Sequence, residues 1–92
     1  MSLKIITVGD KTTHNGTVIS GSPMHDVAGK AIARLGDKVD CPDHYPGGKP
    51  HGINSIVTAH KTLTAGGIPV AVEGCETECG CKLIGSASAS VD

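Results

Sequence analysis

The phrase GDKTTHNG, residues 9–16, occurs again in altered form as GDKVDCPDH at residues 36–44 and as GCETECGC at residues 74–81. Superposing the first glycine of each phrase places His14, Cys41 and Cys79 at one position of a repeated unit. Self-similarity at intervals of a few tens of residues is the signature of a repeat architecture. The pattern therefore predicts three related units within 92 residues.

The segments that follow these phrases also match one another. VISGSPMHDVAGKAIARLGD (18–37) is similar to IVTAHKTLTAGGIPVAVEGC (56–75), whereas the third copy, LIGSASASVD (83–92), lacks a return segment. The N-terminal LKIITVGD (3–10) has the length and apolar pattern of that missing piece. We therefore expect a circular permutation in which the first strand completes the last unit, the termini meet and a closed, pseudo-threefold body results.

Each unit has the pattern of β structure. Its apolar runs are short, rich in Val and Ile, and bounded by Gly, Pro, Asp and Ser. DVAGKAIA (26–33) and TLTAGGIPVA (62–71) resemble hairpins with glycines at their turns, and helical periodicity is absent over any useful length. The predicted fold is all-β, a small pseudo-threefold cone or β-prism of short antiparallel strands in three small sheets, forming a single domain over residues 1–92.

The composition offers little for a hydrophobic core. The chain has one Tyr, no Phe or Trp, and 13 Gly. A domain of this size is marginal without a staple such as a metal, disulfides, oligomerisation or a partner. Because no secretory signal or membrane-spanning run is evident, we expect folding in a reducing cytoplasm, where four Cys and five His favour a metal over disulfides.

Several function classes are disfavoured. The net charge is −1 without a basic cluster, and stacking aromatics are lacking, so nucleic-acid binding is not expected. The sequence contains no G-x-S-x-G elbow, no Walker-type loop and no C-x-x-C pair, which argues against an enzyme. Asp10 and Asp37 follow glycines at turns, and we expect them to accept hydrogen bonds from nearby backbone amides.

The repeated position supplies the candidate metal ligands. Zinc in a structural site takes four nitrogen or sulfur ligands, and threefold geometry provides only three, namely His14, Cys41 and Cys79. The fourth ligand must lie on the axis or come from the insertion CPDHYPGGKPHGIN (41–54), which offers His44 and His51. Two further thiols are not assigned as ligands. Cys81 is equally well explained as a small buried apolar side chain, and packing is the favoured interpretation of Cys75.

The sequence resembles the PAAR-repeat family along nearly its whole length. The matching segments are GDKTTHNGTVISGS, VAGKAIARLGDKVDCP, HGINSIV, GGIPVAVEG and ECGCKLIGS, in that order. The motif that names the family corresponds to KAIAR (30–34), whose central residues depart from it mildly. The resemblance implies a small cone on the end of the trimeric valine-glycine-repeat spike of the bacterial type VI secretion system.

The resemblance also implies a metal near the apex. The family favours three His and one Cys around zinc or iron. The residues carried over are His14, Cys41, His51 and Cys79, with His44 and Cys75 as substitutes. At Cys75 this chain departs from relatives that have His there.

These inferences combine into one expected function. The protein should be a non-enzymatic tip that caps and sharpens the spike, one copy per trimer, with zinc as the structural metal and iron as the alternative. It should not self-assemble, it should pierce rather than insert into a membrane, and it should help to recruit effectors. We expect assembly in the bacterial cytoplasm, followed by secretion or injection without a signal peptide.

Two rival functions make different predictions. A free-standing zinc-binding interaction module would be a monomer that ignores any trimeric spike. A small hydrolase or redox enzyme would require a pocket and either an open metal position or a reactive thiol.

Overall fold

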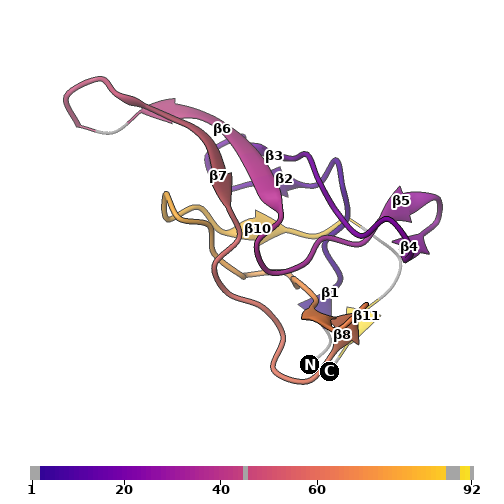
Figure 1. Cartoon of the computed structure of the whole chain (residues 1–92). Helices are drawn as coiled ribbons and strands as arrows, with labels where there is room; N and C mark the ends of the chain where they lie inside the picture. The colour runs from indigo at the N-terminus through magenta and orange to yellow at the C-terminus, as the bar shows by residue number, and fades with distance from the viewer. Residues whose placement is uncertain (1–2, 45, 87–89, 92) are drawn as a thin grey trace.

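The chain folds into short β-strands joined by tight turns (Figure 1). This computed structural model describes residues 3–44, 46–86 and 90–91. The described strands are β1 (Leu3–Lys4), β2 (Lys11–Thr12), β3 (Thr17–Val18), β4 (Asp26–Val27), β5 (Lys30–Ala31), β6 (Lys38–His44), β7 (Pro50–Ser55), β8 (Thr64–Ala65), β9 (Ile68–Pro69), β10 (Leu83–Ile84) and β11 (Ser90–Val91). The all-β prediction is confirmed.

Three two-stranded antiparallel sheets repeat the same strand pairing. They pair β4 with β5, β8 with β9, and β1 with β11. The first two are the hairpins predicted at residues 26–33 and 62–71. Their turns pass through Ala28–Gly29 and Gly66–Gly67, where φ lies between 52° and 83°. Two consecutive positive φ values match the right-handed twist of a two-residue hairpin, which explains the glycines.

The third of these sheets closes the molecule. Leu3 pairs with Val91 and Lys4 pairs with Ser90, so the first strand completes the last unit. Figure 1 shows the two ends of the chain side by side. The predicted circular permutation is therefore confirmed by the strand pairing.

A fourth sheet departs from the expectation of three. It has five strands in the order β10-β2-β3-β6-β7, and it joins the repeated phrases to the insertion of the second unit. The insertion forms the long hairpin β6–β7, which extends away from the rest of the molecule (Figure 1). The pairing of β10 with β2 through Leu83 and Thr12 and that of β3 with β6 through Val18 and Val39 are the same contact in successive units, and the insertion only lengthens β6 and β7.

A ring of backbone hydrogen bonds marks the pseudo-threefold axis. The amide of Ile6 donates to the carbonyl of Ala71, the amide of Ala71 donates to Ala33, and the amide of Ala33 donates to Ile6, at 2.9–3.0 Å. These three residues are equivalent in the repeat, and all are fully buried. Small side chains predominate because three chain segments converge on one line.

The repeated phrases are held in the same way in each unit. The amides of Gly9, Gly36 and Gly74 donate to the carbonyls of Val18, Ile56 and Leu83, respectively, at 2.8–3.0 Å. The three acceptor residues are buried and belong to the main core cluster. This equivalence shows that the superposition made on the sequence is also a superposition in space.

The aspartates of the first two phrases close their own turns. Asp10 accepts a hydrogen bond from the amide of Thr7 at 2.9 Å, and Asp37 accepts one from the amide of Arg34 at 2.7 Å. The prediction for these two carboxylates is confirmed. In the third unit Cys75 occupies the equivalent place and packs against the core cluster.

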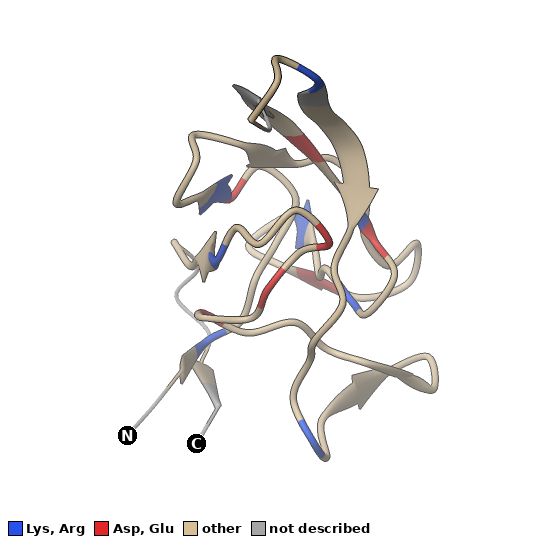
Figure 2. Ribbon diagram, turned by 90° about the vertical axis from the view of Figure 1, so that its left-hand side faces the viewer, with Lys and Arg blue, Asp and Glu red and all other residues tan. Residues whose placement is uncertain are grey.

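Charged residues of both signs are interspersed over the molecule (Figure 2). This distribution agrees with the absence of a basic cluster in the sequence. Within the described residues, no helix is long and apolar enough to cross a bilayer.

Candidate metal centre

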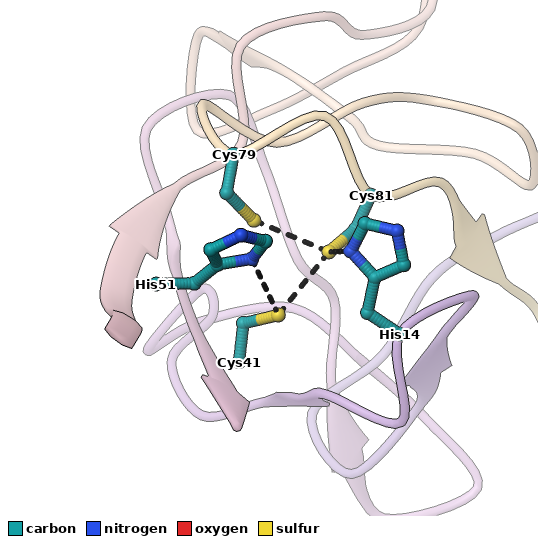
Figure 3. Close-up of side chains that lie close together, drawn as sticks. All are labelled: His14, Cys41, His51, Cys79 and Cys81. Carbon is teal, nitrogen blue, oxygen red and sulfur yellow. Dashed lines mark hydrogen bonds between the residues drawn. The ribbon is translucent and has the colours of Figure 1, made fainter. Parts of the chain in front are cut away.

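Two loops and the β6–β7 hairpin bring five metal-ligating side chains together (Figure 3). His14 lies in the turn between β2 and β3, Cys41 on β6 and His51 on β7. Cys79 and Cys81 lie in the loop that precedes β10. One ligand atom from each residue lies within 4.8 Å of the ligand atoms of the others. All three units therefore contribute to one cluster.

The donor atoms are in close contact. Cys81 Sγ lies 2.9 Å from His14 Nδ1, 3.3 Å from Cys41 Sγ and 3.2 Å from Cys79 Sγ. Cys41 Sγ lies 3.3 Å from His51 Nδ1. The two imidazole rings are tilted by 53° with centroids 5.6 Å apart, so they face the cluster from different directions.

Neighbouring polar groups hold the loops that carry these donors. Thr12 Oγ1 accepts hydrogen bonds from the amides of His14 and Gly16, at 3.3 and 2.9 Å. On the other side, the Asn54 side chain accepts a hydrogen bond from the amide of Cys79 at 3.3 Å. These hydrogen bonds hold the backbone on two sides of the cluster, so the donor side chains stay directed toward one another.

The thiols differ in burial and in proton affinity. Cys41 and Cys81 are buried, and Cys79 is partly exposed. Burial, together with the neighbouring thiols of Cys79 and Cys41, raises the pKa of Cys81 to about 12. Burial also opposes ionisation of Cys79, but hydrogen bonds from Thr77 and from the other thiols outweigh it and lower the pKa of Cys79. The two neighbouring thiols therefore differ in proton affinity, and because they are in contact they titrate as a pair.

The donor set fits a tetrahedral zinc ion in type and in spacing. Zinc–sulfur bonds of 2.3 Å and zinc–nitrogen bonds of 2.0–2.1 Å give tetrahedral edges of about 3.8 Å between two sulfurs and about 3.5 Å between sulfur and nitrogen. The contacts in the cluster are shorter than these edges by only about 0.2–0.6 Å, a gap that small outward movements of the side chains close. Zinc takes four ligands in a structural site, and five are present.

The structure brings together the four residues predicted as ligands, His14, Cys41, His51 and Cys79. Of the two substitutes, Cys75 packs against the hydrophobic core, and the side chain of His44 lies outside what the structure describes. All four cysteines are free thiols.

Cys81 is the member of the cluster that sequence reasoning did not assign. In the repeat it stands at the position of Gly16, so the superposition that identified the other donors gives no ligand there. The available signal was its place two residues after Cys79 in the C-G-C tripeptide. In a loop this tight, both thiols reach the same point, as their 3.2 Å separation shows.

A comparison with family models finds the PAAR motif over residues 8–85. That range contains all five cluster residues and the described strands from β2 to β10. No curated protein matches the chain significantly.

Proposed function

Because this chain belongs to the PAAR-motif family, whose model covers most of its length, we propose that it forms the tip of a type VI secretion spike. The family is one of spike tips, and its motif implies association with that spike. For this chain we propose one copy on the blunt end of one trimer, where it caps and sharpens the assembly.

The observation that carries the proposal is the closed ring of Ile6, Ala33 and Ala71. One chain donates three equivalent backbone bonds in a closed ring, so its three units surround a single axis. A trimer also presents its surface three times about an axis. A pseudo-threefold monomer can therefore meet three identical chains without a symmetry mismatch, and the stoichiometry that follows is one to three.

A threefold set of exposed apolar side chains supports the same proposal. Ile19, Val57 and Ile84 follow the buried residues of the three units and are 44%, 48% and 45% exposed. Their near-equal exposure follows from their equivalence in the repeat. Exposed apolar side chains can take part in an interface, and three at equivalent positions suit a partner with the same symmetry. Exposed strand edges would add backbone pairing with the spike's own strands.

The metal has a structural role in this proposal. When bound, it would supply a closed tetrahedral link among loops from all three units. Its binding free energy would then become folding free energy, which a domain with one aromatic residue needs. The ion is taken to be zinc, with iron as the alternative. Three of its ligands come from the repeated position (His14, Cys41 and Cys79), and the fourth is either His51, as the sequence predicted, or Cys81.

The role proposed is mechanical and not catalytic. The tip would be assembled with its spike in the bacterial cytoplasm and then exported with it, passing through a membrane without becoming part of it. Recruitment of effectors is a second proposed role. Neither role requires the protein to self-associate.

The decisive experiment is the stoichiometry of the complex with the spike. The full chain, loaded with zinc, is mixed with the trimeric spike protein of the same bacterium, and the mass of the complex is measured by native mass spectrometry. One copy per trimer is expected. Failure to form a complex at high micromolar concentration, with the protein folded and loaded, would instead favour a free-standing zinc module.

A further inference from the structure

We propose that Cys81 is the axial metal ligand of this chain, and that the metal is held by His14, Cys41, Cys79 and Cys81, a set of three thiolates and one imidazole. This inference rests on the proposed structural metal and specifies its ligands. It differs from the set of three His and one Cys that the family resemblance implies.

The first step is the symmetry of the contacts. His14, Cys41 and Cys79 occupy the equivalent position of the three units, and Cys81 Sγ touches the donor atom of each, at 2.9, 3.3 and 3.2 Å. An atom at nearly equal distance from three symmetry-related atoms lies close to their common axis. The three equivalent donors thus form the base of a tetrahedron whose apex is the sulfur of Cys81 (Figure 3).

The second step is why the first unit does not also supply an apex. The position of Cys81 in the third unit is that of Gly16 in the first. A Cβ atom at Gly16 would lie 2.8 Å from Thr12 Oγ1 and 2.9 Å from the carbonyl oxygen of Asp40, so a side chain does not fit there. Three side chains cannot share one axis. The glycine of the first unit leaves the apex to the cysteine of the third.

The third step concerns burial. Cys81 has no solvent exposure and Cys41 only 1%, whereas Cys79 and the two imidazoles are partly exposed. If an ion bound the other four donors, the Cys81 sulfur would remain at ligand–ligand distance from three of them. It would have to move into a packed interior to avoid the ion. Coordination requires no such movement, and three cysteines with one histidine are an established set for structural zinc.

In this ligand set, His51 contacts one of the ligands and does not bind the ion itself. Its Nδ1 lies 3.3 Å from Cys41 Sγ, a distance at which a protonated ring nitrogen donates a hydrogen bond to a thiolate. Such outer contacts orient a ligand and adjust its charge, and their loss typically lowers metal affinity by about 10–100-fold. An affinity measurement alone therefore does not separate the two roles, and the ligands must be identified by element.

X-ray absorption at the zinc edge, measured on the wild-type full chain, makes that identification without any variant. The expected result is three sulfur neighbours at about 2.3 Å and one nitrogen neighbour at about 2.0–2.1 Å. Two sulfurs and two nitrogens, or one sulfur and three nitrogens, would overturn the proposal. A chain that binds no zinc would overturn both this inference and the proposed structural metal.

Cobalt substitution then assigns the sulfurs to residues. The thiolate-to-cobalt charge-transfer absorption per bound ion should fall by about one third in Cys81→Ala, because one of three thiolates is lost. It should stay unchanged in His51→Ala and in Cys75→Ala, which removes a thiol that packs against the core. An unchanged band in Cys81→Ala would refute the assignment. If one copy per trimer still forms while these tests fail, the proposed function stands and only the ligand set is wrong.

Discussion

His14 Nδ1 lies 2.9 Å from Cys81 Sγ, although 67 positions separate the two residues in the chain. One belongs to the first repeated phrase and the other to the third. The two phrases meet because β2 pairs with β10, which places Thr12 opposite Leu83, while β1 pairs with β11 and closes the ring of units. The metal centre and the closed fold thus depend on each other.

Removing the metal should destabilise the whole fold. Structural zinc contributes apparent binding free energies of about 10–16 kcal/mol in small zinc-dependent folds. Since a free-energy change of 1 kcal/mol moves the melting temperature of a domain this size by about 4–8 °C, chelation should lower Tm by at least about 15 °C. Differential scanning fluorimetry with an extrinsic dye, before and after chelation and after zinc is restored, measures the effect. An identical Tm in the loaded and chelated protein would exclude a structural metal.

Replacing His14 by alanine should reduce metal content and stability together. The variant loses the only ligand from the first unit, so the remaining donors no longer link all three units. Zinc content measured by mass spectrometry should fall to less than half an ion per chain, and Tm should fall with it. His25→Ala is the matched control, since His25 lies beside Ser22 at 3.3 Å and outside the cluster. Full zinc occupancy in His14→Ala would remove that residue from the site.

Metal affinity should rise with pH between 6 and 8. Burial and neighbouring thiols raise the pKa of Cys81 to about 12, so in the metal-free protein this thiol carries its proton throughout that range. A ligand must lose its proton to bind zinc, and binding therefore releases protons. Acidification favours the protonated, metal-free form, and alkalinisation favours the complex. Competition with a chromophoric chelator at several pH values tests the sign, and an affinity that is constant or falls with rising pH would contradict it.

Enlarging a side chain on the axis should lower the free energy of unfolding. Ala33 has no solvent exposure, and its backbone belongs to the central ring, so Ala33→Leu has no space to fill. Overpacking of a tight core costs about 1–3 kcal/mol. Urea denaturation should show a loss in that range. Val57→Leu provides the control at a half-exposed site, where a change below about 0.5 kcal/mol is expected. Equal losses in both variants would argue against a crowded axis.

Charges placed on the exposed apolar set should weaken binding to the spike. The triple variant Ile19→Asp, Val57→Asp, Ile84→Asp puts a carboxylate at each equivalent position, and desolvating three charges opposes docking. We expect at least a hundredfold loss of affinity with the fold retained, as measured by biolayer interferometry and circular dichroism. Met24→Asp changes a residue that is 83% exposed and should bind normally. Wild-type affinity in the triple variant would direct the search to another surface.

Much of the fold could be predicted because the repeated unit is recognisable in the sequence. Glycines at turns, short Val- and Ile-rich runs and the missing return segment together indicated the hairpins and their closure. The long β6–β7 hairpin could not be predicted in the same way, because most of it lies in an insertion without counterparts, and repeat superposition has no information about an insertion. The joining of the units into one five-stranded sheet depends on contacts between neighbouring units, such as Val18 with Val39, which the pattern within one unit does not reveal.

The residues of the candidate site were also predictable only where the repeat or the family resemblance identified them. His14, Cys41 and Cys79 could be grouped because their positions are equivalent, and His51 because the family resemblance supplied it. Cys81 could not be distinguished from a buried apolar side chain, since its equivalent is Gly16 and a threefold pattern cannot identify a residue that lies near its axis. Only the measured separations among the sulfurs reveal its central position.

The ring formed by Ile6, Ala33 and Ala71 has a mechanical consequence. Each amide in it donates to the next unit in the same rotational sense, so every unit is both donor and acceptor and none is terminal. A compressive load applied along the axis is therefore shared by three hydrogen bonds in parallel. Because the ring has no end, none of these bonds is a terminal one that would break first. Resistance to a force along the axis would then come from the closed ring of hydrogen bonds. This explains how a domain with so few aromatic side chains in its core could withstand such a force.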